Sequence, residues 1–163
     1  MAWMCAGASA PVAASDYPST PKALVETYLR LDAEAAGLSP STWPELGQYT
    51  NFPQAPKWES FVVIDRYEIG NVLEGHTRAQ VRVTYHPLGQ FSDKFTPGTA
   101  SESVIFYLNK VRDQWRVDTP IMPHVSFVVM KKRLDARSSA NPKEKKANDA
   151  FIQQIESVRS AMK

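Results

Sequence analysis

A chain of 163 residues fits one domain and is long enough to bury a hydrophobic core. Hydrophobic residues make up 43% of the chain and charged residues 22%, a composition that excludes wholesale disorder. The formal net charge of +2 is too weak to steer the whole molecule toward nucleic acid or anionic lipid, so we expect no nucleic-acid partner.

The first residues, 1–14, form an apolar, small-residue segment (MAWMCAGASAPVAA) without a charged side chain. This composition is typical of the second half of a secretory signal peptide, although no positively charged start precedes it. We therefore expect a signal remnant, a mature chain that begins near Ser15, and a periplasmic or secreted protein; the alternative is a cytoplasmic protein with an unstructured leader. Cys5 is the only cysteine, which excludes a disulfide framework. No apolar run reaches the length of a transmembrane helix.

After a short linker the sequence predicts an amphipathic helix. Ser19 or Thr20 can cap it, Pro21 suits its first position, and Gly37 is expected to end it. Its apolar residues recur at three- and four-residue steps: Leu24, Val25, Tyr28, Leu29, Leu31 and Ala35. The proline-rich segment 39–56 then predicts one short helical turn at 44–46 within otherwise irregular chain.

Four strands are expected next, because the hydrophobic period changes from that of a helix to two. They cover residues 58–69, 77–85, 101–111 and 115–118, separated by turns at 70–75 and 112–114 and by a polar loop at 87–97. The third strand is apolar on both faces, which predicts a central place in the sheet.

The register of the first two strands follows from their apolar faces. The two strands bury a common apolar face only in an even register, such as the one that places Asp65 opposite Val81 and Phe61 opposite Tyr85. The first helix is expected to cover this sheet, so the side chain of Val83 should be buried beneath it. The same reasoning predicts that Ile105 of the third strand is buried there.

The C-terminal part, residues 131–163, is expected to form a charged helical extension. The β-branched run from Val125 to Val129 suits either a helix or a strand. A capping box at Asn141 and Glu144 predicts a last helix over 141–162, with an apolar stripe of Phe151, Ile155, Val158 and Met162. We expect this stripe to dock on the sheet or on a second copy of the chain as a homodimer, unless the helix is a frayed tail.

Helices and strands are segregated along the chain, which predicts an α+β fold with an antiparallel sheet. The order of elements and the hairpin 109–117 (NKVRDQWRV) resemble the nuclear-transport-factor-2-like, or cystatin-like cone, superfamily over residues 20–130. The resemblance implies a curved sheet packed by an N-terminal helix. That superfamily contains ketosteroid isomerases, polyketide cyclases, dehydratases, limonene epoxide hydrolases and many binding or accessory domains, so the fold leaves the function open.

Asp65 is the leading candidate for a catalytic residue. In the expected register it shares an apolar face with Val63 and Tyr67, where burial would raise its pKa toward neutrality, as acid–base catalysis requires. The alternative is that it pairs with an arginine, caps a helix or turns outward at a bulge. Tyr28 and Asp118 are the expected companions, because the ketosteroid isomerases that the chain resembles combine a carboxylate base with a tyrosine and a protonated acid.

Histidines offer one further acid–base candidate and no metal site. His124 follows Pro123 at a strand-to-helix junction, where it is expected to act as an acid, a base or a hydrogen-bond donor. The spacing of His76, His86 and His124 matches no metal-binding pattern, so we expect no metal and no cofactor. The sequence also lacks the glycine-rich and nucleophile-elbow motifs of Rossmann enzymes, P-loop proteins and α/β-hydrolases.

Two hypotheses about function follow. The first is an exported ligand-binding or accessory domain for a small apolar molecule or a protein partner. Its apolar pocket would be lined by six aromatic residues: Trp58, Phe61, Tyr67, Tyr85, Phe106 and Trp115. The second is a cofactor-independent isomerase, cyclase or dehydratase with Asp65 as general acid or base. A cavity around Asp65 with a second polar group in reach would favour the enzyme, and a solid apolar core would argue against it.

Overall fold

The computed structural model describes residues 16–52 and 54–163. The expectations for residues 1–14, for Cys5 and for a mature start near Ser15 lie outside these residues. Within the described part, none of the helices has the length and apolar composition that crossing a membrane requires.

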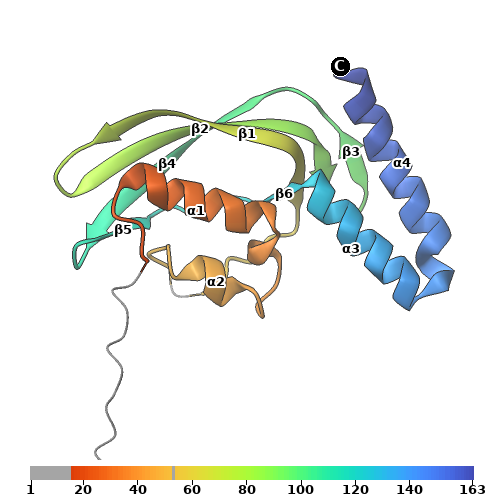
Figure 1. The fold of residues 1–163 in the computed structure, drawn as a ribbon, viewed down its shortest axis with the longest axis horizontal. Helices are drawn as coiled ribbons and strands as arrows, with labels where there is room; N and C mark the ends of the chain where they lie inside the picture. The colour runs from red at the N-terminus through yellow and green to blue at the C-terminus, as the bar shows by residue number, and fades with distance from the viewer. Residues whose placement is uncertain (1–15, 53) are drawn as a thin grey trace, which may run out of the picture.

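The chain folds as α+β around a strongly curled sheet (Figure 1). The helical elements are α1 (Pro21–Ala33), η1 (Ala36–Leu38), α2 (Trp43–Gly47), α3 (Phe127–Ala140), η2 (Pro142–Glu144) and α4 (Lys145–Ala161). The strands are β1 (Phe61–Glu74), β2 (Arg78–Phe91), β3 (Phe95–Pro97), β4 (Glu102–Val111), β5 (Gln114–Val117) and β6 (His124–Ser126). They lie in the order β5-β4-β2-β1-β6, with β3 paired to β2. Only β6 is parallel to its neighbour, β1, so the sheet is mostly antiparallel as expected.

Helix α1 begins as the sequence predicts and ends earlier. Thr20 caps it by accepting a hydrogen bond from the Ala23 N–H at 3.1 Å, and Pro21 occupies the first turn. The helix stops at Ala33, and Ala35, with a φ of 67°, takes the left-handed conformation that was expected of Gly37. Gly37 is closely surrounded, because an added Cβ would lie 3.3 Å from the side chain of Leu46 and 3.4 Å from the Asp32 carboxyl group.

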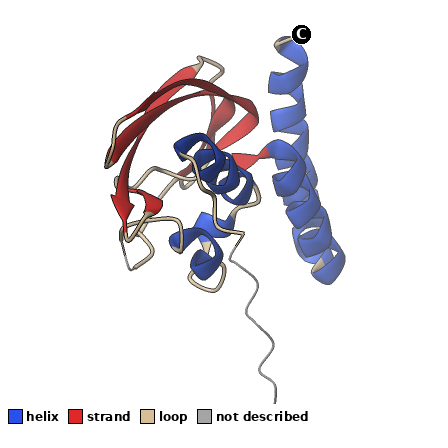
Figure 2. Ribbon diagram, turned by 60° about the vertical axis from the view of Figure 1, so that its left-hand side comes forward, coloured by secondary structure: helices blue, strands red, loops and turns tan. Residues whose placement is uncertain are grey.

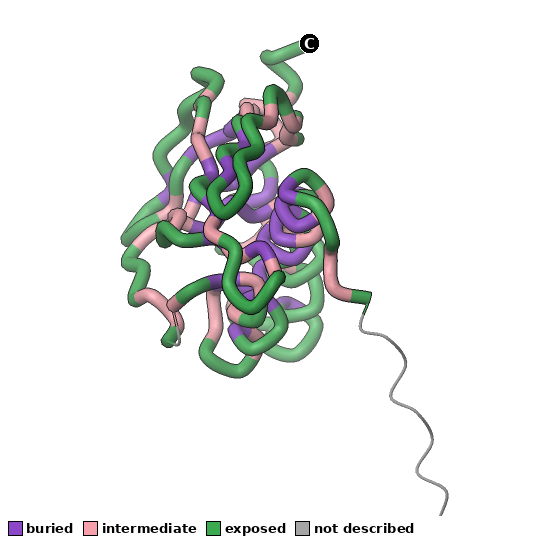
Figure 3. The backbone as a smooth tube through the Cα atoms, turned by 90° about the vertical axis from the view of Figure 1, so that its left-hand side faces the viewer, coloured by how far each residue is buried: buried purple, intermediate pink, exposed green. Residues whose placement is uncertain are grey.

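The main core lies between the concave face of the sheet and the helices α1 and α2, which occupy the hollow of the curl (Figure 2). Leu24 and Val25 of α1 contribute to it and are fully buried, and the buried residues gather where α1 meets the sheet (Figure 3). Val83 is also fully buried here, as expected. Ile105 is not, because it pairs with Arg82 on the convex face, so the expectation for Ile105 is wrong.

The residue pairs predicted between β1 and β2 are wrong, although the central pairs Tyr67–Tyr85 and Ile69–Val83 keep the expected even register. Both strands are longer than expected, since β2 continues through the segment predicted as a polar loop, and Phe61 pairs with Phe91 instead of Tyr85. Two irregularities interrupt the pairing between Val63 and Arg66. Asp65 is skipped in the register, as at a β-bulge, which turns a side chain away from its expected face.

Helices α3 and α4 form a pair on the opposite, convex side of the sheet (Figure 2). The chain around Val125 takes both conformations that the sequence allowed, since strand β6 leads directly into α3. Ile152 and Ile155 of α4 are buried in a second core with Val63, so the last helix docks on the chain's own sheet. Met162 is 38% exposed and does not belong to the buried stripe.

The expected capping box does not form. Asn141 makes no side-chain hydrogen bond to the helix backbone, and its amide instead donates to the carboxylate of Glu144 at 2.9 Å. Glu144 is the last residue of the short η2 turn, which lies between Asn141 and the start of α4 at Lys145. The proline at position 142 therefore starts a 3₁₀ turn and not the helix itself.

Candidate functional site

A buried carboxyl group stands at the end of α1, inside the curl of the sheet. Asp32 is only 2% exposed, and its Oδ2 atom accepts a hydrogen bond from the backbone N–H of His124 at 2.9 Å. Burial raises the pKa of Asp32 to about 8, and the hydrogen bond from His124 opposes this rise. The carboxyl group is therefore mainly protonated at neutral pH.

The imidazole of His124 connects this buried region to the surface. Its ring stacks on Tyr85, with centroids 3.7 Å apart and planes 6° apart. Its Nε2 atom lies 3.3 Å from Oε2 of Glu102, whose side chain is 43% exposed. The hydrogen bond with His124 holds the pKa of Glu102 below its usual value, against an opposing effect of burial. Glu102 is therefore an accessible, ionised carboxylate whose position is held by its hydrogen bond to the buried imidazole of His124.

Two tyrosines complete the buried cluster. Burial raises the pKa of Tyr85 well above its usual value, and the nearby Asp32 adds to this effect; the same two causes raise the pKa of Tyr28. Both phenols are therefore neutral hydrogen-bond donors at physiological pH. Among the described residues, no hydrogen-bond partner lies within reach of the Tyr85 hydroxyl or of Nδ1 of His124, so both polar atoms have unused capacity.

The sheet topology explains why these groups meet. Glu102 opens β4 directly opposite Tyr85 on β2, which places the carboxylate beside the stacked rings. His124 opens β6, which pairs with β1 through Val62 and brings the ring to the inner edge of the sheet. Asp32 reaches the same edge because it lies one helical turn after Tyr28 on the buried face of α1.

A surface pocket of about 500 Å³ opens beside Glu102. It lies between the ends of β2 and β3 and the loop 98–100, with Gln90, Thr96 and Thr99 among its polar walls. Of the described residues that line it, Glu102 is the only charged one. Gly89 allows the pocket to form, because an added Cβ there would lie 2.4 Å from the ring of Phe95 and would separate β3 from β2.

The concave core itself leaves little space. A recess of about 200 Å³ lies next to Tyr28, Asp32 and Trp58, and it is too narrow to hold a water molecule. Phe106 is fully buried and packs edge-on against Tyr28, with ring centroids 5.3 Å apart. The interior at these residues is therefore solid.

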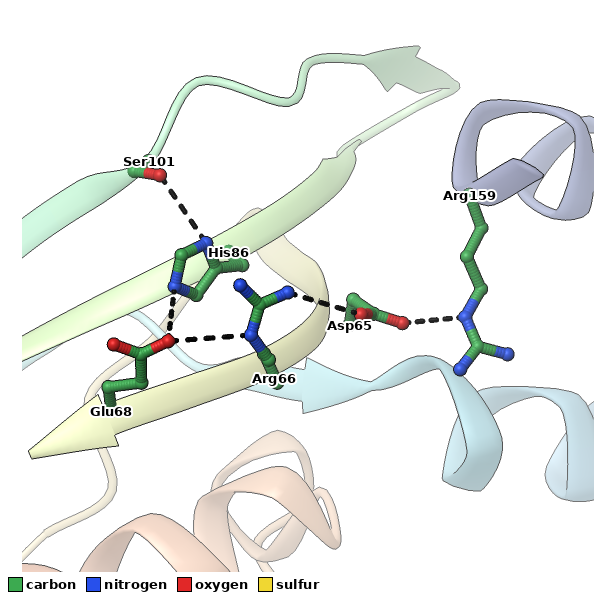
Figure 4. Close-up of polar contacts among 6 residues, drawn as sticks. All are labelled: Asp65, Arg66, Glu68, His86, Ser101 and Arg159. Carbon is green, nitrogen blue, oxygen red and sulfur yellow. Dashed lines mark hydrogen bonds and ion pairs between the residues drawn. The ribbon is translucent and has the colours of Figure 1, made fainter. Parts of the chain in front are cut away.

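The structure separates the four predicted catalytic residues. Tyr28 and His124 belong to the buried cluster around Asp32. Asp65 lies outside it, where its carboxylate accepts a hydrogen bond from Arg159 of α4 at 2.6 Å and contacts Arg66 at 3.7 Å (Figure 4). This is the alternative of a bulged carboxylate paired with arginine. Asp118 is exposed and accepts a hydrogen bond from the Asn51 amide at 3.1 Å, away from the cluster.

The six aromatic residues expected to line one pocket also occupy different places. Tyr85, Phe106 and Trp115 are buried in the concave core, where Tyr67 is partly buried. Trp58 is 37% exposed beside the narrow recess. Phe61 packs against Phe91 in the second core, on the other side of the sheet.

Sequence reasoning missed Asp32 and Glu102, the two carboxyl groups nearest to His124. Asp32 was visible in principle, since it falls four residues after Tyr28 on the apolar stripe of the first helix, where a charged residue is out of place. Glu102 carries no such signal, because only the pairing of β4 with β2 brings it to the cluster.

Comparisons with protein-family models, curated proteins and solved structures find no match for the chain. The α+β architecture and the curled half-barrel sheet are therefore established from the structure itself. The geometry around Glu102 and His124 is the basis for any statement about function.

Proposed function

We propose that the chain is a small ligand-binding or accessory domain of the nuclear-transport-factor-2-like type, and that its ligand binds in the pocket beside Glu102. The observation that carries this proposal is the ionised Glu102 carboxylate at the edge of an open pocket, held by the buried His124 imidazole. A carboxylate fixed in this way loses little conformational freedom when it binds a ligand, which favours affinity.

The chemistry of the pocket favours a hydrophilic ligand over the apolar one expected from the sequence. Glu102 accepts hydrogen bonds and attracts cations, and no lysine or arginine is among the described lining residues to compete for it. Gln90, Ser92 and Thr99 supply further polar groups. A small molecule with an amino group or several hydroxyl groups satisfies these side chains.

Chemical-shift mapping of the full chain with putrescine and glucosamine tests this proposal. We expect shifts in the amide resonances of residues 96–102 that saturate with ligand. Glu102→Gln should weaken binding by about 10- to 100-fold, since a hydrogen bond to a charged group contributes about 1.5–3 kcal/mol. The matched control is Glu45→Gln, an exposed glutamate on α2. Equal binding by the Glu102→Gln and Glu45→Gln variants, or no shifts at the pocket, would contradict the proposal.

Proton transfer is a second candidate function, favoured by the buried cluster behind Glu102. Asp32, with its pKa of about 8, holds the backbone of His124, and Tyr28 and Tyr85 remain protonated beside it. Acid–base roles would then fall to Glu102 and His124, in place of Asp65. Deuterium exchange at the α-carbon of small ketones in D₂O tests this, with loss of exchange expected in His124→Asn and Glu102→Gln. Exchange that persists in both variants would exclude these roles.

We also propose that the protein acts outside the cytoplasm, as the apolar leader at residues 1–14 indicates. N-terminal sequencing of the protein expressed with its upstream region tests this. We expect a mature chain that begins near Ser15 in the exported fraction. An intact Met1 on cytoplasmic material would contradict it.

A further inference from the structure

His86 links a serine and a glutamate on the convex face of the sheet (Figure 4). The Ser101 hydroxyl lies 3.4 Å from Nδ1 of His86, and Nε2 of the same ring lies 3.1 Å from Oε1 of Glu68. Ser101 directly precedes β4, and His86 and Glu68 lie on the neighbouring strands β2 and β1. This site is distinct from the pocket beside Glu102.

The two contacts of His86 select one form of its ring. A carboxylate accepts but does not donate, so Nε2 must carry the proton that faces Glu68. In the neutral ring this leaves a lone pair on Nδ1, directed at the hydroxyl of Ser101. A hydroxyl next to a base that is itself oriented by a carboxylate is the arrangement that activates serine nucleophiles.

The serine of this site is accessible to solvent, and two arginines lie near the site. Ser101 is exposed, whereas the side chain of His86 is only 17% exposed and is held between its partners. Arg66 donates to Glu68 at 3.4 Å and keeps that carboxylate in place. Arg82 reaches along the same face to the hydroxyl of Ser103 at 3.2 Å, which places a cation one side-chain position from Ser101.

We propose that Ser101 is an activated nucleophile that accepts acyl groups from reactive esters, with His86 as its general base. Oγ of Ser101 forms a bond to the ester carbonyl carbon, and its proton passes to Nδ1 of His86. The bond from that carbon to the leaving oxygen then breaks, and the His86 proton goes to the leaving group. The product is an acyl ester of Ser101, and the guanidinium of Arg82 is available to stabilise the oxyanion that forms in between. Glu68 is a positioning residue.

Acetylation of the full chain by p-nitrophenyl acetate, mapped by peptide mass spectrometry, tests the proposal. We expect Ser101 to be acetylated at least about tenfold faster than Ser103, because general-base assistance contributes about 10²- to 10⁴-fold. Ser103 is the matched control, since it lies two residues further along the chain, in β4, but contacts Arg82 and not a histidine. Equal acetylation of the two serines would overturn the proposal.

Variants of His86 and Glu68 distinguish a chemical role of these residues from a purely structural one. His86→Ala should lower the acetylation rate of Ser101 at least about tenfold, and added imidazole should restore part of it, which a purely structural role would not produce. Glu68→Gln should change the pH dependence of the acetylation rate. If His86→Ala melts earlier than the parent chain, the Glu68→Gln variant decides the question. An unchanged rate in a folded His86→Ala, or an unchanged pH profile in Glu68→Gln, would show that Ser101 is an ordinary hydroxyl.

Discussion

Asp32 accepts a hydrogen bond from the backbone N–H of His124 at 2.9 Å, which joins the end of α1 to the start of β6 through a carboxyl group that is mainly protonated at neutral pH. This contact connects residues 92 positions apart in the chain. It places a titratable group at the junction between the first helix and the edge of the sheet.

The contact predicts an unusual dependence of stability on pH. The pKa of Asp32 is about 8 in the folded chain and about 3.9 when unfolded. The pKa of Asp32 is higher in the folded chain than in the unfolded chain, so the protonated side chain stabilises the fold. This contribution of Asp32 to the free energy of unfolding is complete below about pH 4 and declines as pH rises to about 8. The decline is at most about 5 kcal/mol, from a shift of about four pKa units.

Asp32→Asn removes this titration and keeps an oxygen that can accept from His124. We expect the variant to be more stable than the parent at pH 8 and to lose less stability between pH 4 and pH 8. Urea unfolding at pH 4, 6 and 8 measures the difference. Asp118→Asn is the control, because Asp118 is exposed. Parallel pH profiles for the parent and the Asp32→Asn variant would contradict the prediction.

The two faces of the sheet should respond differently to truncation. Val83 is fully buried beneath α1, so Val83→Ala should lower the free energy of unfolding by about 2–3 kcal/mol. Ile105 lies on the convex face and is partly exposed, so Ile105→Ala should cost less than about 1 kcal/mol. Chemical denaturation of both variants checks the assignment. Similar losses at the two positions would mean that the faces are not as described.

Docking of α4 should depend on Ile155. This side chain is fully buried against the convex face, so Ile155→Ala should cost about 2–5 kcal/mol. Met162→Ala, at a residue that is 38% exposed, should change stability by less than about 0.5 kcal/mol. Thermal melts compare the two, and sedimentation of the same samples tests whether a homodimer forms. A melting midpoint unchanged in Ile155→Ala would show that α4 does not stabilise the sheet.

The pocket beside Glu102 should depend on the absence of a side chain at Gly89. An alanine there would place Cβ 2.4 Å from the Phe95 ring, and overpacking of this kind costs about 1–3 kcal/mol. Gly98 in the same pocket has no atom within 4 Å of the equivalent position, so Gly98→Ala should be tolerated. Hydrogen exchange of the β3 amides measures the effect. Equal protection in the two variants would contradict this account of the β2–β3 pairing.

Local patterns predicted the elements well and their arrangement less well. The spacing of apolar residues and the cap at Thr20 identified α1, and alternation identified β1, β2, β4 and β5, because both signals arise within a few residues. The short β3 lies in the segment predicted as a loop. The register of β1 and β2 depends on irregularities around Asp65, which no local pattern reveals. For the same reason the predicted role of Asp65 could not anticipate its pairing with Arg159, which is 94 residues away in sequence.

The candidate site was even less accessible to prediction. Tyr28 and His124 were chosen for their chemistry, and the structure places both in the buried cluster. Their partnership with Asp32 and Glu102 depends on β6 lying beside β1 and on Tyr85 pairing with Glu102. These contacts join residues far apart in the sequence. Sequence patterns can therefore suggest which residue types take part, but not which of them lie side by side in the fold.

The parallel pairing of β6 with β1 has a consequence for the order in which the molecule folds. The hairpin of β1 and β2 joins segments that are close in sequence, so it can form early. Pairing of Val62 with His124 must wait until nearly the whole sheet region has left the ribosome and its long loop has closed. Until then Asp32 has no N–H to bind, and the end of α1 remains hydrated. We therefore expect the polar cluster to be the last part of the concave core to gain protection during refolding.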